Sequence, residues 1–360
     1  MSREKYRVAV VGGAGTWGRN YLRAFAAHPD CQVVALIDRA RDRRRAFAEH
    51  YAIEHQFDDL DEFLCRDVPD IVAAVVPVAA NPGTVIASAE AGVKVVSCEK
   101  PIAAQLSQAD DMVRICRERG TVFSCGSVYS GIPHLTKTLD WVRQGHLGQI
   151  AEVAIPSGLP KEMAGGGCVQ LSLLRLFTGM EVEWVEGWTL PPAKDWSWPP
   201  DVPQEEIDCP GYGRLGLSSG LICDMLAPGE HGCPLALGFE QGRLWIASPH
   251  PVFIRGQGAA SSPVFPTFLQ TPPGNFFTLR IERLLRACDT GRDELDSGRN
   301  YHQALEIAIA LKWSHCNAHR RVALPLKDRS LRIVPHPYRL QGGDVAGWES
   351  IGYQGPPEIE

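Results

Sequence analysis

The sequence has no Cys-x-x-Cys pair, no internal repeat and no apolar run near the ~20 residues that span a bilayer. Its 11 cysteines are scattered and odd in number, so we expect no disulfide framework and predict a reducing, cytoplasmic setting. An excess of one charge is also missing, because the net charge is only -6. Binders of nucleic acid or of anionic membranes need a cationic surface, so we expect neither partner.

The composition is that of an ordinary globular protein, with 44% hydrophobic and 22% charged residues. A chain of 360 residues exceeds what one core usually supports, which predicts two domains. In the first third, short apolar runs alternate with helical patterns, and this spacing predicts an α/β Rossmann domain with a doubly wound parallel sheet. The expected strands are 6–11, 33–37, 71–76, 93–98 and 121–125, and the expected helices are 17–28, 39–51, 82–91 and 107–119, the last capped by Ser107.

The pattern changes in the second half. Strand-like runs at 150–155, 182–188, 235–239 and 244–247 follow one another without interleaved helices, which predicts an α+β domain with an open mixed or antiparallel sheet. Expected helices lie at 135–144 and 301–313, a strand at 321–326, and irregular Pro-rich stretches at 191–210 and 256–273. We therefore predict a Rossmann domain at 1–128, a substrate and oligomerisation domain at 129–334, and a surface tail at 335–360.

A GxGxxG motif follows the first expected strand and opens the first expected helix, as Gly13-Ala14-Gly15-Thr16-Trp17-Gly18. We expect Gly13 to permit the turn, Gly15 to let the backbone approach a pyrophosphate, and Gly18 to let helix and strand pack closely. The phosphates would then lie on the helix N-terminus, so Thr16 and Trp17 also join the predicted cofactor site.

Asp38 lies 20 residues beyond Gly18, at the end of the second expected strand. A carboxylate there accepts hydrogen bonds from a ribose 2′-hydroxyl and repels a 2′-phosphate, which favours NAD over NADP. Arg39 leaves NADP possible, because it can stack on adenine or soften the exclusion. The alternative for Asp38 is that it only caps the next helix.

Further motifs follow along the chain: Pro77, Ala89-Glu90-Ala91-Gly92, Cys98-Glu99-Lys100-Pro101, Gly126, Pro133 and Gln144-Gly145-His146-Leu147-Gly148-Gln149-Ile150. With the glycine motif, they make residues 5–150 resemble the glucose–fructose oxidoreductase/inositol dehydrogenase (Gfo/Idh/MocA) family. The resemblance resumes at 165–167 and 304–308. It implies an NAD(P)-dependent oxidoreductase that acts on a polyhydroxylated, sugar- or inositol-like small molecule. It also implies a homodimer or homotetramer formed through the second sheet.

In this family the lysine of Glu-Lys-Pro lies near the nicotinamide and the substrate, so the resemblance places Lys100 in the catalytic, cofactor and substrate sites. A partly buried ammonium has a lowered pKa and can exchange protons near neutral pH. The alternative is a surface lysine paired with Glu99. The resemblance also places Pro77, Asn81 and Glu99 at the cofactor.

The sequence departs from the family at the residues that move protons. Asn81 stands where the family often has histidine. The helix after Gly-Gly-Gly usually carries Asp-x-x-x-His, but here the histidine place is Arg175 or Val169, and the last aspartate place is Ser172. The usual proton-transfer pair is therefore missing or supplied from elsewhere.

Several residues are candidates to replace that pair. Tyr129 can relay a proton beside Lys100, although packing at a domain junction explains it equally well. Gln170 can hydrogen-bond a substrate hydroxyl but has no useful pKa. His134 is better explained as a helix-start residue, and Lys161 as a solvated loop lysine.

Two other groups were weighed as sites. His315 and His319 share a helix face at metal-compatible spacing, but no third ligand is visible and a helix C-terminus favours histidine anyway, so we predict no metal. Trp184 and Trp188 have the even spacing of one strand face and are expected to pack. For Trp196 and Trp198, sugar stacking and packing both remain open.

Three functions remain open from the sequence. The first is hydride transfer between nicotinamide and a polyol. The second is a lyase, hydrolase or epimerase that retains NAD and oxidises its substrate transiently. The third is a non-catalytic dinucleotide-binding regulator, because function follows the site and not the fold.

Overall fold

The structure is a computed structural model that describes residues 4–126, 132–192, 198, 200–229, 232–247, 249–293 and 295–342. The chain divides into two compact units. Unit 1 comprises Met1–Ser127, Asn275–His302 and Pro337–Glu360, and unit 2 comprises Val128–Gly274 and Gln303–His336. No helix among the described residues is long and apolar enough to cross a membrane.

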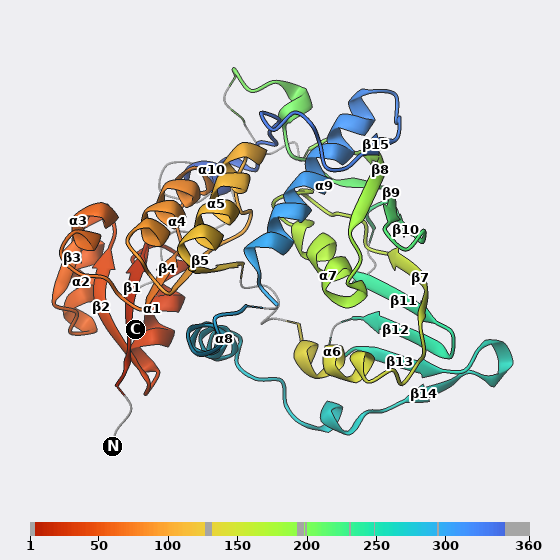
Figure 1. Cartoon of the computed structure of the whole chain (residues 1–360), viewed down its shortest axis with the longest axis horizontal. Coiled ribbons are helices and arrows are strands. Elements are labelled where there is room, and N and C mark those ends of the chain that lie inside the picture. The colour runs from red at the N-terminus through yellow and green to blue at the C-terminus, as the bar shows by residue number, and fades with distance from the viewer. Residues whose placement is uncertain are drawn as a thin grey trace. The chain divides into compact units, whose positions relative to one another are not determined.

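Unit 1 is built on a six-stranded sheet in the order β3-β2-β1-β4-β5-β6, in which every neighbouring pair is parallel. This confirms the predicted doubly wound sheet (Figure 1). The strands are buried on both faces, which is why they read as short continuous apolar runs. They are β1 (Tyr6–Val11), β2 (Cys31–Ile37), β3 (His55–Phe57), β4 (Ile71–Ala74), β5 (Val95–Cys98) and β6 (Val122–Cys125).

The connecting helices lie close to their predicted places. They are α1 (Gly18–Ala27), α2 (Arg41–His50), α3 (Leu60–Leu64), α4 (Asn81–Glu90) and α5 (Leu106–Arg119). The predicted Ser107 cap is wrong, because α5 begins one residue earlier and its N-cap Gln105 makes no side-chain cap bond. Gly120 ends α5 in the left-handed conformation, with φ at 71°. The three-residue β3 and five-residue α3 were too short to show a period.

A helix from the far end of the chain completes the core of unit 1. Helix α8 (Phe276–Thr290) contacts α1, β5 and β6. Its apolar face joins a cluster in which strand, α1 and α8 residues pack together, including Val8, Leu22, Phe25, Ile281, Leu284 and Leu285. This division differs from the predicted boundaries, which assigned all of 129–334 to the second domain.

Unit 2 contains a nine-stranded sheet in the order β14-β13-β12-β11-β7-β10-β9-β8-β15. Strands β10 and β7 are parallel and the other pairs antiparallel, which confirms an open mixed sheet. The strands are β7 (Ile150–Ile155), β8 (Val182–Thr189), β9 (Gly211–Leu217), β10 (Ile222–Met225), β11 (Leu235–Phe239), β12 (Gly242–Ile246), β13 (Val252–Arg255), β14 (Ser262–Val264) and β15 (Val322–Ala323). The strand expected over 321–326 is thus reduced to two residues.

Three main helices accompany this sheet: α6 (Leu135–Arg143), α7 (Cys168–Thr178) and α9 (Gly298–Cys316), which starts in unit 1. The other elements of the described residues are short helices: η3 (Gln204–Glu206), η4 (Gly258–Ala260) and η5 (Thr267–Gln270) in unit 2, and η1 (Val78–Ala80) and α10 (Pro337–Gln341) in unit 1. One sheet face is buried, and at Gly187 it meets α9 so closely that a Cβ would overlap the Leu311 carbonyl.

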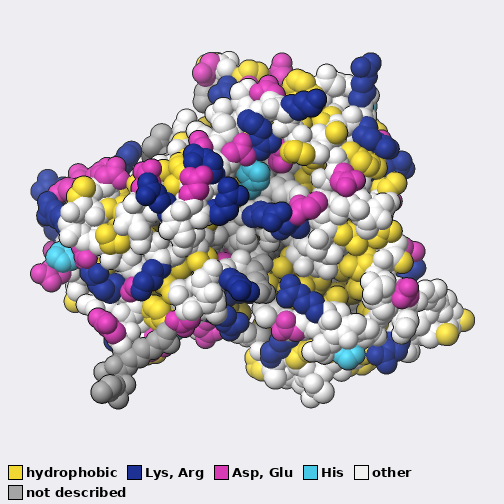
Figure 2. Space-filling view, viewed as in Figure 1, with side chains coloured by type: hydrophobic (Ala, Val, Ile, Leu, Met, Phe, Trp, Pro, Cys, Tyr) yellow, Lys and Arg dark blue, Asp and Glu magenta, His cyan; other side chains and the backbone are white. Residues whose placement is uncertain are grey.

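The opposite sheet face carries partly exposed side chains. Trp184 and Trp188 lie on it, as predicted from their even spacing, and they pack on neighbours: Arg321 lies 3.6 Å above the Trp184 ring, and Trp188 stacks on His319 at 4.9 Å. Trp245 is 36% exposed on β12. Figure 2 shows hydrophobic side chains gathered over this part of the chain, whereas acidic and basic side chains are interspersed elsewhere on the same view.

Candidate cofactor and substrate sites

The glycine-rich turn between β1 and α1 contains four glycines, and they have different structural roles. Gly12 has φ at 75°, and a Cβ there would overlap the Val75 carbonyl, so the turn itself depends on Gly12 and not on Gly13 as predicted. A Cβ on Gly13 would lie 2.7 Å from the Leu36 side chain, so its role is close packing. A Cβ on Gly18 would overlap the Gly12 carbonyl, which is the close helix–strand approach expected of it.

Gly15 is less crowded than the other three. A Cβ there would meet one described atom, the Gly12 carbonyl oxygen, in a tight contact at 3.2 Å. A ligand can therefore approach the backbone at Gly15, just before the N-terminus of α1. Thr16 is half-buried in this turn, and Trp17 is 40% exposed at the N-cap of α1. These residues fit a pyrophosphate.

The carboxylate of Asp38 lies beside this turn. Its Oδ2 accepts from Ala14 N at 3.0 Å and its Oδ1 accepts from Ala40 N at 2.9 Å. The alternative that Asp38 serves as the helix cap does not hold, because the N-cap of α2 is Ala40 and no side chain caps it. The carboxylate is thus fixed where it can accept from ribose hydroxyls and repel a 2′-phosphate. Arg39 is exposed, while the Arg44 guanidinium donates to the Asp38 carbonyl oxygen.

Glu99 is held by α1 and by the glycine-rich turn. Its Oε1 accepts from Tyr21 OH at 2.7 Å and from Trp17 Nε1 at 3.3 Å, and its Oε2 accepts from Lys100 N at 3.4 Å. The Trp17 ring is itself packed on Phe277, with ring centroids 5.4 Å apart. Glu99 therefore joins the phosphate-binding turn to the loop that carries Lys100, and it is more than the surface partner of that lysine.

Asn81 supports the other side of the Lys100 loop. It is fully buried, and its Nδ2 donates to the carbonyl oxygens of Glu99 at 3.0 Å, Pro101 at 3.1 Å and Ile102 at 3.3 Å. The prediction that Asn81 contacts the cofactor is not supported, because a side chain with no exposed surface has no room for a ligand. It instead fixes the backbone on both sides of half-buried Lys100. Pro77 is half-buried at the end of β4 and starts η1.

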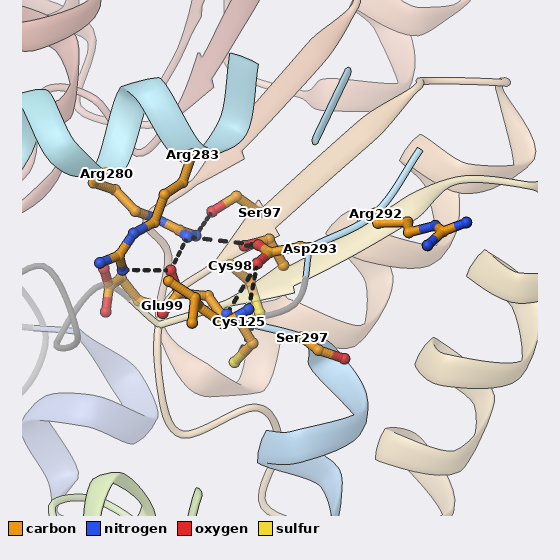
Figure 3. A network of polar contacts seen from close by, with 12 residues as sticks. Ser97, Cys98, Glu99, Cys125, Arg280, Arg283, Arg292, Asp293 and Ser297 are labelled. Carbon is orange, nitrogen blue, oxygen red and sulfur yellow. Dashed lines mark hydrogen bonds and ion pairs between the residues drawn. The ribbon is translucent and has the colours of Figure 1, made fainter. Parts of the chain in front are cut away.

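A buried polar network lies behind this loop and was missed from the sequence (Figure 3). Arg280 of α8 donates to Ser97 Oγ at 2.7 Å and to Asp296 Oδ2 at 2.8 Å, and Arg283 donates to the same oxygen at 3.2 Å. Burial raises the pKa of Asp296 to about 6 against the opposing charge of Arg280. The signal for this network that the sequence does contain is a charged residue on the apolar face of α8, where Arg280 lies one turn before Leu284.

Unit 2 has a second glycine-rich turn, just before α7, and a buried carboxylate fills it. Asp208 Oδ1 accepts from Met163 N at 2.7 Å and from Cys209 N at 2.9 Å, and Oδ2 accepts from Ala164 N at 3.0 Å and from Gly165 N at 2.9 Å. Sequence reasoning missed Asp208 because it lies more than 40 residues beyond the turn. Three of its four donors, Met163, Ala164 and Gly165, belong to the turn before α7, so the carboxylate fixes the backbone that starts this helix.

A second carboxyl lies against the first. Glu162 is buried beside Gly165, where a Cβ would overlap its carboxylate, and its Oε1 accepts from His336 N at 2.8 Å. Burial and the nearby Glu162 charge raise the pKa of Asp208 to about 7, although backbone donors oppose that shift. The pair is enclosed by protein, which makes it a support for the turn.

Helix α7 carries no acid or base at the places where the family has them. Ser172 is buried and donates to Cys168 O at 2.6 Å. Arg175 forms a salt bridge with Glu181, with Nε to Oε1 at 3.1 Å. Gln170 is 9% exposed, and its Oε1 has no hydrogen-bond partner among the described residues. Gln170 is therefore the polar group of α7 with bonding capacity to offer a ligand.

The other predicted residues fall as follows. Tyr129 and Trp196 lie outside the described residues. His134 starts α6 with φ at 57°, and burial lowers its pKa. Lys161 is exposed, as predicted. The Trp198 ring packs edge-on against His336, at 6.3 Å.

His315 and His319 are used within unit 2. Thr189 N donates to His315 Nδ1 at 3.4 Å, and His319 Nδ1 lies 2.8 Å from the Gly187 carbonyl oxygen. Burial lowers the pKa of His315. In the described ranges, no group of three or more His, Cys, Asp or Glu side chains could hold a metal ion.

Comparison with known proteins agrees with this geometry. Residues 6–127 match the sequence model of the oxidoreductase family with an NAD-binding Rossmann fold, GFO_IDH_MocA. A dTDP-3,4-didehydro-2,6-dideoxy-alpha-D-glucose 3-reductase from Actinomadura kijaniata is 26% identical over 67% of this chain and 74% of its own length. A 2,7-anhydro-N-acetylneuraminate hydratase from Mediterraneibacter gnavus is 29% identical over 39% of this chain and only 37% of its own length.

A solved structure extends the likeness to the whole fold. The aldose-aldose oxidoreductase from Caulobacter crescentus covers 89% of this chain and 100% of its own, with a TM-score of 0.69 and 21% identity. At that identity the likeness concerns the fold, including the second sheet. The resemblance found in the sequence is thus confirmed, and residues 6–127 are an NAD-binding Rossmann domain of the Gfo/Idh/MocA oxidoreductase family.

Proposed function

We propose that this protein is an NAD-dependent dehydrogenase or reductase that acts on a CH–OH group of a sugar- or inositol-like polyol. The observation that carries the proposal is the fixation of the Lys100 loop within an NAD-binding unit. Asn81 donates to the carbonyls on both sides of Lys100, and Glu99 is bonded to Tyr21. A reacting group held this rigidly is what positioning of a substrate hydroxyl requires.

The residues of unit 1 divide the work. Gly15, Thr16 and the N-terminus of α1 would hold the pyrophosphate, and the Asp38 carboxylate would accept from the ribose hydroxyls. NAD(H), when bound, supplies or accepts the hydride. The Lys100 ammonium would bond the reacting oxygen of the substrate and exchange its proton, with Tyr129 as a relay. The fixed Asp38 supports NAD over NADP.

Unit 2 would recognise the substrate without the family's usual acid and base. Gln170 would bond a substrate hydroxyl through its Oε1, which is buried and has no partner among the described residues. An amide orients a hydroxyl but does not titrate. Proton transfer would therefore depend on Lys100 and Tyr129.

The test is a screen of sugars, sugar acids and inositols with NAD, following NADH absorbance at several pH values. We expect turnover with at least one member, and loss of that turnover in Lys100→Met with NAD affinity unchanged. Lys161→Met is the matched control, because Lys161 is an exposed lysine in a loop of unit 2. No turnover in the whole set, with NAD still bound, would contradict hydride transfer.

The same screen separates the other two functions. Substrate consumption seen by NMR without net NADH, with NAD retained through purification, would indicate a lyase, hydrolase or epimerase, and one relative is named a hydratase. A wild-type protein that shows no activity in any of these assays, and whose ligand binding persists unchanged in Lys100→Met, would indicate a regulator.

The open sheet face of unit 2 supports a proposal about assembly. Ile222 is 46% exposed, Val252 39% and Trp245 36% on strands β10, β13 and β12. We propose that this face forms a homodimer or homotetramer contact in a cytoplasmic protein, where its free cysteines stay reduced. Light scattering would give a dimer or tetramer mass, and Trp245→Glu would reduce it to that of a monomer.

A further inference from the structure

A fully buried arginine lies behind the carboxyl end of β5. Arg280 is 0% exposed, and its guanidinium donates to Ser97 Oγ through one nitrogen and to Asp296 Oδ2 through the other. Removing a guanidinium from water costs several kcal/mol, which an ion pair only partly offsets. What the arginine provides, and an apolar side chain would not, is the bond to the strand (Figure 3).

Ser97 is placed to affect the Lys100 loop. It is the third residue of β5 and lies two residues before Glu99, which follows the strand. Glu99 is already bonded to Tyr21 and Trp17. Arg280 therefore holds the end of β5, just before the Lys100 loop, through its bond to Ser97. Neither Asn81 nor Glu99 bonds the chain at that position.

The same guanidinium connects β5 to its neighbour. Its acceptor Asp296 receives the Cys125 N–H on its carbonyl oxygen, at 2.6 Å. Asp293, whose Oδ2 lies 3.9 Å from Arg280 Nη1, accepts a hydrogen bond from the Ser124 hydroxyl. The ends of β5 and β6 are thus joined through one side chain of α8.

We propose that Arg280 is a positioning residue that sets the orientation of Lys100, and this inference rests on the proposed function. The planar guanidinium bonds Ser97 and Asp296 through two separate nitrogens, whereas a lysine would have to reach both acceptors from its one ammonium nitrogen. Without the bond to Ser97, the carboxyl end of β5 keeps its pairing with β4 and β6 but loses its side-chain link to α8. A displacement on the order of 1 Å at a reacting group can cost about 100-fold in rate.

The test uses Arg280→Lys and Ser97→Ala in the full chain, with a substrate from the screen. Arg280→Lys keeps the buried positive charge, and Ser97→Ala keeps the ion pair, so both should fold. We expect kcat to fall about tenfold in each, with the Kd for NAD changed less than about twofold. The double variant should lose no more kcat than the more impaired single variant, because both substitutions remove the same Arg280–Ser97 bond. Arg283→Lys is the control, since Arg283 bonds Asp296 but not Ser97, and its kcat should stay within about twofold.

A second readout does not depend on turnover. Trace acetylation of Lys100 by acetic anhydride, measured by mass spectrometry against pH in the NAD-loaded protein, gives the pKa of its ammonium. We expect Arg280→Lys and Ser97→Ala to shift that midpoint by about 0.5 pH unit or more, and Arg283→Lys to leave it in place. If the wild type turns nothing over, the proposed function fails while the labelling still tests the positioning. Unchanged midpoints, or equal losses in Arg283→Lys, would overturn the inference.

Discussion

Two glycine-rich turns in this chain precede a helix, and they use their backbone N–H groups in opposite ways. The turn before α1 is open at Gly15, with Asp38 beside Ala14 N. The turn before α7 is filled by the protein's own anion, because Asp208 accepts from Met163, Ala164 and Gly165. Glycines show that backbone donors are accessible. They do not show whether the anion comes from a ligand or from the chain.

The difference follows from what surrounds each turn. A Cβ at Gly15 would have 3.2 Å to its nearest described neighbour, whereas a Cβ at Gly165 would overlap Glu162. An open turn can accept a phosphate, and a closed turn can only stabilise the fold. Four tests of this contrast follow, in order of decreasing expected effect.

The largest effect is expected from removing the internal anion. Asp208→Ala removes the acceptor of the buried Ala164, Gly165 and Cys209 N–H groups, whereas Met163 N keeps the Cys209 carbonyl oxygen. Each group left without an acceptor costs about 1–3 kcal/mol. We expect the free energy of unfolding of unit 2 to fall by at least about 3 kcal/mol in a urea titration. Asp201→Ala, at an exposed aspartate, should change it by less than about 0.5 kcal/mol. A small loss in Asp208→Ala would mean that water replaces the carboxylate and that the two turns are alike.

Glycine substitutions in the first turn should separate packing from binding. Gly18→Ala forces a Cβ into the Gly12 carbonyl, so we expect a loss of about 2–3 kcal/mol of stability. Gly15→Ala should lower the unfolding midpoint less than Gly18→Ala, because its Cβ would lie 3.2 Å from the Gly12 carbonyl oxygen, but it should weaken NAD binding about tenfold, because the methyl group occupies the ligand's side of the turn. Calorimetry of NAD binding and thermal melts measure both. A reversal of the two phenotypes would contradict the assignment of Gly15 to the ligand.

The pH dependence tests whether the internal anion is charged. The pKa of Asp208 is raised to about 7 in the folded protein, above the ordinary value of a free carboxyl. The folded state then binds this proton more tightly than the unfolded state, so protonation of Asp208 stabilises the fold. That contribution is lost as pH rises towards and through 7. Between pH 6 and 8 that loss is on the order of 1 kcal/mol.

Asp208→Asn separates this contribution from that of the histidines, because the histidines titrate in both proteins but the amide does not titrate. The amide oxygen still accepts from two donors. We expect the stability advantage of the wild type over Asp208→Asn to shrink by about 1 kcal/mol from pH 6 to pH 8 in urea unfolding. A constant difference would show that the four N–H donors keep the carboxylate ionised throughout, like the phosphate expected at the first turn.

The smallest effect concerns the external ligand. Asp38→Ala removes the charge that repels a 2′-phosphate, so we expect the ratio of NAD to NADP affinity to fall about fivefold or more. Fluorescence titration with NADH and NADPH measures it. Asp42→Ala, on the exposed side of α2, should leave the ratio unchanged. An unchanged ratio in Asp38→Ala would mean that Asp38 only orders the turn.

The order of strands and helices in unit 1 could be predicted because parallel strands read as apolar runs and glycines mark their ends. The GxGxxG motif and Asp38 were found for the same reason, since their spacing is local. The turn glycine was misplaced by one residue, because motif letters do not reveal that Gly12 is the residue with positive φ.

What could not be predicted depends on contacts between distant segments. Asp208 and the turn it fills are more than 40 residues apart, and Arg280 reaches Ser97 across 183 residues. Asn81 was assigned to the cofactor from its place in a family pattern, but its full burial could only be seen in three dimensions. Hydrophobic periodicity carries no information about such partners.

Helix α8 has a consequence for how the protein is made. Its residues Ile281 and Leu284 pack on Val8 and Phe25 in the core of unit 1. A ribosome adds roughly 5–20 residues per second, so on the order of ten seconds passes between synthesis of β6 and synthesis of α8. During that time the apolar surface of α1, β5 and β6 that α8 packs against lacks this helix, and a chaperone that shields apolar surface would act there.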